Sequence, residues 1–251
     1  MGLSAEASIG CERSSFEVAF VDETGRRRRD ALSSCWDAAF ERAEPVRSFP
    51  ATKASRSYSG YWWSVTTGRH VGYESWVERN VAMMLDFDRE VAAFSSQPFW
   101  LHWQASDGRV HRHAPDYFVR LADGSGLVVD VRGDDQVDAV AAESFAATEQ
   151  ACAQVGWGFE RTGGPGAVLA ANVRWLAAHR HRRCHEPRIA EALLAVLSRP
   201  APLMAAAEAV GDRLGVLPVL FHLMWRQVLT ADLRRAVLSP HTVVGLGEGA
   251  G

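Results

Sequence analysis

The segment at residues 110–131 constrains the fold of this chain more than any other part of the sequence. Two apolar stretches, 110–121 and 127–131, are separated by Ala-Asp-Gly-Ser-Gly at 122–126. A glycine-containing turn between two stretches of β-forming residues is typical of an antiparallel hairpin. We therefore expect two paired strands here, with polar residues at the end of the hairpin away from the turn.

The register of this hairpin decides which side chains share a face. With the turn centred on Gly124, we predict that Asp116 lies opposite Arg132 and Phe118 lies opposite Asp130. Side chains alternate between the two faces of a strand, so the even-numbered Asp116, Asp130 and Arg132 are expected on one face. A slip of one residue would separate them.

A helix is predicted over residues 74–87, before the hairpin. Val77, Val81, Met84 and Leu85 recur at helical spacing and form one apolar stripe, and Glu78 lies beside that stripe. A second helix is expected at residues 139–153, after the hairpin.

Three acidic side chains and one cation form the candidate site. Two carboxylates at neighbouring cross-strand positions repel each other unless they share a cation, and Mg²⁺ prefers such oxygen ligands. We expect Asp116 and Asp130 to bind the metal, with the carbonyl oxygen of Val131 and the carboxylate of Glu78 completing the site. A metal held there can polarise a phosphodiester and activate water, and Arg132 can stabilise the developing charge.

Structural alternatives remain for each of these residues taken alone. Pro-Asp at 115–116 is a common turn dipeptide, and Asp130 opposite a cation can be an ordinary cross-strand ion pair. It is the combination of a helix Glu, a Pro-Asp and an acidic-x-basic tripeptide in this order that favours cleavage of a nucleic acid strand.

Composition sets limits on the remaining readings. The chain has 251 residues, 47% of them hydrophobic, and a formal net charge of −3, so any nucleic acid surface must be local. Its four cysteines (Cys11, Cys35, Cys152 and Cys184) are widely spaced and are expected to be reduced thiols. No apolar stretch approaches the length of a membrane span, so we expect a cytoplasmic protein with no membrane partner.

The sequence changes character after His179. A basic segment at residues 180–187 reads as a linker, and helices are expected at 188–198, 204–214 and 217–229, followed by a short β element at 238–244. Three helices with a small β element predict a helical, winged-helix-like domain. We therefore divide the chain into a partly ordered N-terminal extension at 1–44, a catalytic domain at 45–180 and a C-terminal winged-helix-like domain at 181–251 with a flexible tail.

Several segments together resemble the TnsA family, the endonuclease subunits of heteromeric transposases. The similarity covers about residues 45–180 and is carried by Val-Glu at 77–78, Met-Leu-Asp-Phe-Asp at 84–88, Ser-Gln-Pro-Phe at 96–99, Ala-Pro-Asp-Tyr-Phe-Val at 114–119, Val-Asp-Val-Arg at 129–132 and Ala-Asn-Val-Arg-Trp-Leu at 171–176.

This resemblance implies an α/β fold, a restriction-endonuclease-like (PD-(D/E)XK) mixed sheet flanked by helices. The implied catalytic domain uses Mg²⁺, for which Mn²⁺ can substitute. Glu78 and Asp116 match the family's catalytic Glu and Asp. The implied role is to cleave double-stranded DNA at the 5′ ends of a transposon. The implied partners are a DDE transposase subunit, which processes the 3′ ends, and an AAA+ ATPase regulator.

Arg132 departs from the family pattern, because it stands where the catalytic Lys is expected. A guanidinium stays charged and is a poor base, so Arg132 can stabilise charge but cannot readily exchange a proton. Two alternatives follow: a catalytically weak or inactive subunit that keeps the fold for assembly or DNA binding, and a defence or repair nuclease of the same fold.

Further residues are candidates for contact with DNA. His111 and His113 flank the predicted metal site, where His113 can support a metal ligand or bind phosphate. Arg112 is a further candidate for DNA contact, and Arg180, Arg182 and Arg183 can follow phosphates or simply keep the linker soluble. Packing is the more common role for a tryptophan-rich stretch such as this one, with base stacking as the alternative; its members are Trp62, Trp63, Trp76, Trp100 and Trp103.

Overall fold

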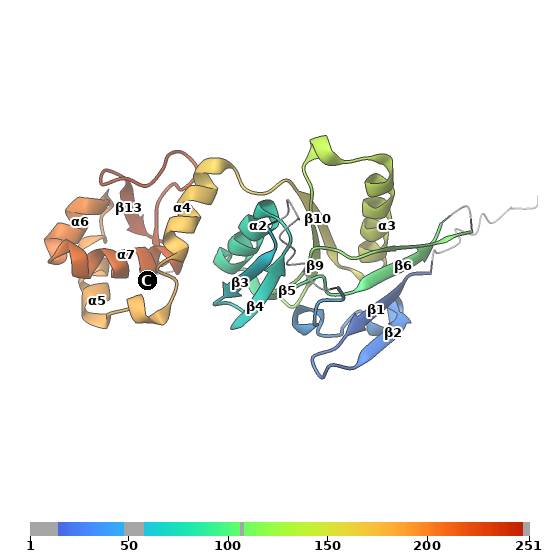
Figure 1. The fold of residues 1–251 in the computed structure, drawn as a ribbon. Helices are drawn as coiled ribbons and strands as arrows, with labels where there is room; N and C mark the ends of the chain where they lie inside the picture. Colours follow the sequence, from blue (N-terminus) through green and yellow to red (C-terminus); the bar gives the residue numbers. More distant parts are fainter. Residues whose placement is uncertain (1–14, 48–57, 106–107, 248–251) are drawn as a thin grey trace, which may run out of the picture.

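The structure, a computed structural model, describes residues 15–47, 58–105 and 108–247. Residues 1–14 of the predicted N-terminal extension, with Cys11, lie outside these ranges, as does the end of the predicted tail. The described chain is elongated, with the C-terminal helices at one end and the first hairpin at the other (Figure 1). None of the described helices is both long and apolar enough to cross a membrane.

A mixed four-stranded sheet forms the centre of the catalytic part. Its strand order is β10-β9-β8-β5, with β9 antiparallel to β8 and parallel to β10. The strands are β5 (Val91–Ser96), β8 (Tyr117–Leu121), β9 (Gly126–Val131) and β10 (Gly158–Thr162). Helix α2 (Trp76–Phe87) covers one face and α3 (Ala139–Val155) covers the other. This arrangement confirms the predicted α/β class and is consistent with a restriction-endonuclease-like fold.

The β8–β9 hairpin exists, but its predicted register is wrong by two residues. Tyr117 pairs with Val129 and Phe118 with Val128, so Phe118 does not face Asp130 and Asp116 does not face Arg132. The turn is tighter than expected because Leu121 N–H donates to the carbonyl of Ser125 (2.9 Å). Gly124 adopts a φ of 88°, which suits a three-residue hairpin loop. A two-residue shift preserves parity, so the even-numbered residues still share a face.

The predicted single strand at residues 110–121 is also wrong. It is divided into β7 (Val110–His113) and β8, which belong to different sheets. Pro115 lies at the break, and proline has no N–H to donate to a ladder. The break places Asp116 immediately before the first residue of β8, at one end of the central sheet.

A second, antiparallel four-stranded sheet has the order β2-β1-β6-β7. Its other strands are β1 (Glu17–Val21), β2 (Arg27–Ala31) and β6 (Trp100–Gln104). Because β1 pairs with β6, the first hairpin shares a sheet with residues of the predicted catalytic domain. One face packs into an aromatic core in which Phe40 makes edge contacts with Phe20, Phe99, Phe118 and Trp157.

A two-stranded hairpin and short helices complete the catalytic part. The hairpin consists of β3 (Gly60–Ser64) and β4 (Arg69–Tyr73). It is fastened to α2 by buried Asp86, whose carboxylate accepts from Trp62 Nε1 (3.0 Å) and Ser64 Oγ (2.7 Å). The short helices are α1 (Leu32–Cys35) and the 3₁₀ turns η1 (Phe40–Arg42), η2 (Asp134–Gln136) and η3 (Arg182–Cys184).

Helices and a small sheet make up the C-terminal part. The elements follow in the order α4 (Ala167–Ala177), α5 (Pro187–Val196), β11 (Ala201–Pro202), α6 (Leu203–Val210), α7 (Arg213–Trp225), β12 (Leu229–Thr230) and β13 (Val243–Leu246). The three predicted helices are present: α5 and α6 are shorter than expected, and α7 has the expected length but lies four residues earlier in the sequence. The short strands form an antiparallel sheet in which β13 lies between β11 and β12.

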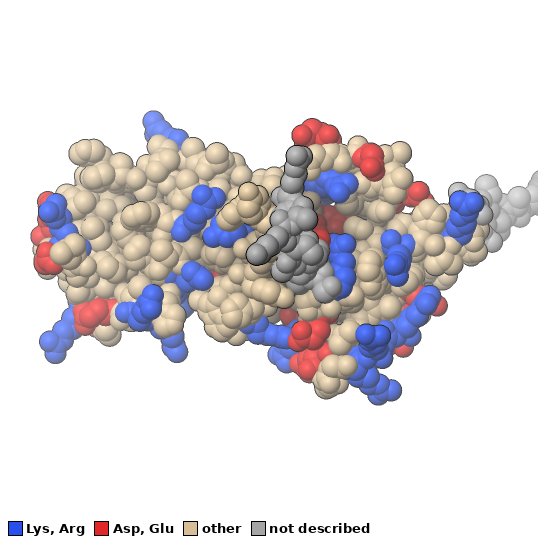
Figure 2. All heavy atoms as spheres, viewed as in Figure 1, with Lys and Arg blue, Asp and Glu red and all other residues tan. Residues whose placement is uncertain are grey.

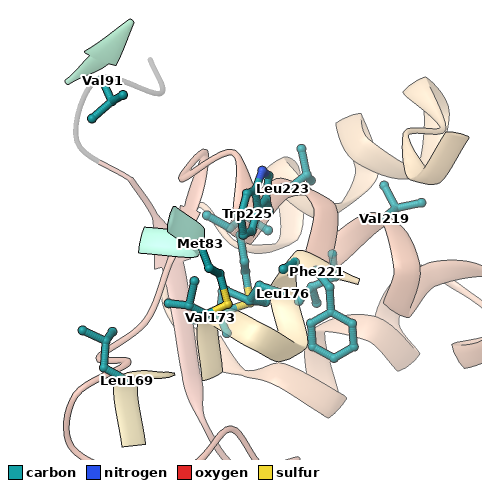
Figure 3. Close-up of a cluster of buried hydrophobic side chains, with 14 of the residues drawn as sticks. Met83, Val91, Leu169, Val173, Leu176, Val219, Phe221, Leu223 and Trp225 are labelled. Atoms are coloured by element: carbon teal, nitrogen blue, oxygen red, sulfur yellow. The ribbon is translucent and has the colours of Figure 1, made fainter. Parts of the chain in front are cut away.

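One hydrophobic core continues from the central sheet into the C-terminal helices. Figure 3 shows Met83 of α2 facing Val173 and Leu176 of α4, with Trp225 of α7 beside them. The Trp225 ring also packs on Phe87 of α2, with 5.2 Å between ring centroids. The two parts are therefore held together by buried apolar contacts as well as by the chain that links them.

Candidate active site

The predicted catalytic and metal-binding residues line one cavity of about 400 Å³ at the end of the central sheet where β8 begins and β9 ends. The cavity lies where the start of β8, the end of β9, the first turn of α2 and the first turns of α3 converge. Its charged and polar lining residues are Arg47, Glu74, Glu78, Arg112, His113, Asp116, Asp130, Arg132, Asp138 and Ser144. The fold therefore brings together residues that lie up to 97 positions apart in the sequence.

Asp116 is fixed at the junction between β8 and β9. Its Oδ2 accepts a hydrogen bond from the backbone N–H of Val131 (2.7 Å), and its own N–H donates to Asp130 Oδ1 (3.3 Å). Burial raises the pKa of Asp116 well above its ordinary value of 3.8, and the charges of Asp130 and Glu78 raise it further. The carboxylates of Asp130 and Glu78 are thus close enough to oppose the ionisation of Asp116.

Asp130 is almost fully buried, and its carboxylate is held by His113. His113 Nε2 lies 3.0 Å from Oδ1 and 2.9 Å from Oδ2 of Asp130. The His113 ring is also fixed by an edge contact with Phe145 of α3, at 6.0 Å between ring centroids. His113 therefore orients one of the predicted metal ligands, which is one of the two roles that its place beside the site allowed.

Glu78 occupies the third position of α2 and completes a capping arrangement. The N-cap residue of the helix is Ser75, whose Oγ accepts from Glu78 N–H (3.1 Å). The Glu78 carboxylate in turn accepts from Glu74 N–H (2.7 Å) and from Ser75 Oγ (2.9 Å). Burial raises the pKa of Glu78 above 4.5, although these hydrogen bonds lower it. Capping is therefore sufficient to orient this side chain toward the cavity.

Arg132 follows the last residue of β9 and is exposed at the rim of the cavity. Its backbone N–H donates to Thr162 O (2.8 Å) and its carbonyl accepts from Arg161 Nη1 (3.0 Å). Within the described ranges, its guanidinium makes no ion pair or hydrogen bond. The cation in the expected lysine position is consequently free to meet an anionic ligand.

The donor set fits a hard divalent cation in its chemistry. Glu78, Asp116 and Asp130 offer carboxylate oxygens around one cavity, and mutual repulsion raises the pKa of Asp116. In the described part of the chain, however, no three His, Cys, Asp or Glu side chains are grouped closely enough to hold a metal ion. Asp130 is engaged by His113 and Glu78 by the helix cap, so these contacts must loosen for all three to share one cation.

The candidate DNA-contact residues separate into two groups. Arg112 and His113 line the cavity, whereas Arg180, Arg182 and Arg183 do not. Arg180 is a structural tie between the linker and β3: its guanidinium stacks on Trp62 at 4.6 Å and donates to Ala177 O and Trp63 O. Because these contacts engage its guanidinium, Arg180 is less available to bind a DNA phosphate than the sequence suggested.

Sequence reasoning missed the place of Arg47 and Glu74 at the cavity, and it named Trp100 only as one of the tryptophans expected to pack or to stack on bases. Arg47 pairs with Glu74 at 2.8 Å on one side, and Trp100 on β6 lies on the other, under the guanidinium of Arg112 (4.4 Å). No signal in the sequence links Arg47 to Glu74, because only folding brings these distant residues together. The alternation along β6 could have indicated that Trp100 faces away from the core.

The cysteines and the remaining tryptophans lie outside this cavity. Cys35 and Cys152 are buried and Cys184 is partly exposed, and all three are unpaired. Among the tryptophans, Trp62 and Trp103 are buried, whereas Trp63 and Trp76 are exposed. Packing thus explains only part of the tryptophan-rich stretch.

Comparison with known families identifies one matching region. Residues 88–161 match the profile of the family described as TnsA-like endonuclease N terminal. This region runs from the start of β5 almost to the end of β10 and contains Asp116, Asp130 and Arg132, but not Glu78. A search of curated proteins finds no significant match.

Proposed function

We propose that this chain is a metal-dependent DNA endonuclease subunit of a heteromeric transposase, because residues 88–161 match the TnsA-like endonuclease N-terminal family. The observation that carries the proposal is the cavity itself. Glu78, Asp116, Asp130 and Arg132 all border it, and the pKa of Asp116 is raised by the charges of the other two carboxylates. Repulsion among carboxylates destabilises a folded protein, and a bound cation would relieve it.

The bound cation would be Mg²⁺, with Mn²⁺ as a substitute. Asp116, Asp130 and Glu78 would hold it, with the carbonyl oxygen of Val131 as a further ligand. When bound, it supplies Lewis acidity toward the scissile phosphate and lowers the pKa of water. Val131 N–H keeps Asp116 in place through its 2.7 Å hydrogen bond, and His113 keeps Asp130 at the cavity.

Arg132 has the role of charge stabilisation. Its free guanidinium at the rim can donate to phosphate oxygens, which gain negative charge as the phosphodiester is attacked. It cannot serve as a proton donor or acceptor near neutral pH, because a guanidinium remains protonated. Proton transfer in this site is therefore left to water or to a carboxyl group.

The proposed substrate is double-stranded DNA at the 5′ ends of a transposon. A DDE transposase subunit would process the 3′ ends, and an AAA+ ATPase would regulate assembly. The family of the matched region supports this role, and genomic neighbours separate it from a defence or repair nuclease of the same fold. A gene for a DDE transposase and one for an ATPase beside this one would favour the transposase role.

We also propose that the C-terminal part is a winged helix, within a division into residues 45–180 and 181–251. The order α5, β11, α6, α7, β12, β13, with β13 in the middle of the sheet, supports the winged-helix topology. Its third helix, α7, is buried along most of its length and has exposed residues mainly in its first turn. That burial makes α7 poorly suited to lie deep in a DNA groove.

The experiment that tests the nuclease is cleavage of supercoiled plasmid by the full chain, together with a DDE transposase subunit, in millimolar Mg²⁺ or Mn²⁺. Asp116→Asn and Glu78→Gln are the informative variants. Asparagine keeps an acceptor for Val131 N–H, and glutamine keeps the helix cap, so each removes charge with little change in structure. We expect each to lose at least ~100-fold in rate; cleavage by both variants at the wild-type rate would refute the proposal.

A catalytically silent subunit of the same complex is the second candidate. Two observations favour it: Arg132 occupies the lysine position, and His113 already holds Asp130. Arg132→Lys distinguishes the two candidates. A chain that binds no metal by calorimetry and gains no cleavage from Arg132→Lys would be an assembly subunit, whereas metal binding that is lost in Asp116→Asn would favour the enzyme.

A further inference from the structure

The β2-β1-β6-β7 sheet has one buried face and one face that is open to solvent. Val18 and Phe20 of β1 and Leu101 and Trp103 of β6 point into the aromatic core. The register places the alternate residues together on the other face: Glu17 pairs with His102, and Ala19 lies between Arg29 and Trp100. Arg27 on β2 and Arg112 on β7 extend this outer face to both edges of the sheet.

This outer face is positively charged although the whole chain is slightly acidic. It carries Arg27, Arg29 and Arg112, and its one carboxylate in these four strands, Glu17, is occupied by Arg29 at 2.7 Å. Within the described residues, Arg27 and Arg112 have no acidic partner. Figure 2 shows basic side chains spaced over the surface that covers β1 and β6.

Arg112 joins this face to the active site. Its guanidinium stacks on the Trp100 ring at 4.4 Å, which fixes its position, and the same side chain lines the cavity with Asp116 and Asp130. Between Arg112 and Arg29 lies His102, whose pKa is lowered first by burial and then by these two arginines. Arg29 and Arg112 therefore belong to one positively charged patch of surface, and that patch reaches the active-site cavity.

We propose that this sheet face binds the sugar-phosphate backbone of duplex DNA beside the scissile phosphate, an inference that rests on the proposed nuclease function. Neighbouring strands are about 4.8 Å apart, so β2 and β7 lie about 14 Å from each other across the sheet. Arg27 lies four positions further along the strands than Arg112, so the two Cα atoms are about 20 Å apart on a diagonal of the sheet. The major groove of DNA is about 12 Å wide, and the long side chains of these two arginines can turn inward to contact phosphates on both sides of it. Arg112 is the inner contact, next to the carboxylates, and Arg27 is the outer one.

The exposed aromatic hairpin β3–β4 is a weaker candidate for this contact. Trp63 and His70 make an edge contact there with 5.0 Å between ring centroids, but neighbouring Arg69 is already engaged by Glu44 at 2.8 Å. The sheet face has free cations instead, and phosphate contacts depend on free cations.

The test is binding of a fluorescent duplex of arbitrary sequence to the full chain, in Ca²⁺ so that the DNA is not cleaved, over a range of salt concentrations. We expect Arg27→Gln and Arg112→Gln each to weaken binding several-fold and to reduce the slope of log affinity against log salt by about 1. The double variant should reduce that slope by about 2.

Arg28→Gln is the matched control. Arg28 lies in the same strand as Arg27 and the variant loses the same charge, but its side chain is on the other face, over Phe20 and paired with Asp30. We expect its affinity and salt slope to stay at the wild-type values.

The outcomes separate this inference from the proposed function. If wild type binds and cleaves DNA but Arg27→Gln and Arg112→Gln behave like Arg28→Gln, the sheet face is not the DNA surface and the nuclease stands. If all three variants lose the same affinity, net charge and not this face determines binding, which also overturns the inference. If wild type shows no binding with its partner present, both the sheet face and the nuclease are refuted.

Discussion

Replacing Asp116 in two ways separates its structural role from its electrostatic one. The carboxylate accepts a 2.7 Å hydrogen bond from Val131 N–H and also faces the charges of Asp130 and Glu78. Asp116→Asn keeps an acceptor and removes the repulsion. Asp116→Ala also removes the repulsion, but it leaves a buried N–H without a partner.

The magnitude follows from the lost hydrogen bond. A buried donor without a partner costs about 1–3 kcal/mol. In a chain of this size each kcal/mol shifts the melting temperature by about 2–4 °C. We therefore expect Asp116→Asn to melt about 2–12 °C above Asp116→Ala, measured by circular dichroism at neutral pH with a chelator present. Asp116→Asn should also melt above wild type under these conditions.

The pH dependence of stability is an independent test of whether carboxylate repulsion destabilises the folded chain. The folded-state pKa values of Asp116 and Glu78 are raised above 3.8 and 4.5, so the folded chain binds these protons more tightly than the unfolded chain. Their stabilising contribution is complete below the ordinary values and is lost as the pH rises through the raised ones. Wild type should lose more stability than Asp116→Asn over this interval, and millimolar Mg²⁺ should restore stability only to wild type.

Two results would refute this reasoning. Asp116→Asn melting below wild type in chelator would mean that repulsion among the three carboxyls does not destabilise the folded chain. Equal melting temperatures for Asp116→Asn and Asp116→Ala would mean that the Val131 hydrogen bond contributes nothing measurable.

Three further predictions concern the scaffold. Asp86→Ala should lower the free energy of unfolding by about 3 kcal/mol or more, measured with urea, because three hydrogen-bond donors lose one buried acceptor group; a loss near zero would contradict this. Asn172→Ala should speed amide hydrogen exchange in residues 231–242, because the Asn172 side chain makes three hydrogen bonds with that loop; unchanged exchange would show that the loop is held by other contacts. Burial raises the pKa of Cys152 to about 12, so an alkylating reagent at neutral pH should modify Cys184 in the native protein and Cys152 only after unfolding.

Local patterns in the sequence were sufficient for the elements around the site. The apolar stripe predicted helix α2, which begins two residues later than expected, and Ser-Trp-Val-Glu at 75–78 encodes its cap. The glycine-containing turn predicted the β8–β9 hairpin. These predictions succeeded because helix periodicity, capping and turn formation depend on residues a few positions apart.

The register and the strand break needed information that a local pattern does not contain. Whether Asp116 faces Arg132 or Asp130 depends on a shift of two residues, which leaves the alternation of faces unchanged. The division of residues 110–121 between two sheets depends on the pairing of β7 with β6 and of β8 with β5. Distant strands decide both outcomes.

The sequence by itself determined the acidic residues, their order and the elements that bear them, because those are properties of short segments. The tertiary structure decided their surroundings: His113 on Asp130, Arg47 on Glu74 and the stack of Arg112 on Trp100. It also decided that Arg132 is free while Arg180 is engaged. Two arginines that look equivalent in the sequence acquire different roles, because the burial and the partners of each side chain are set only when distant segments pack together.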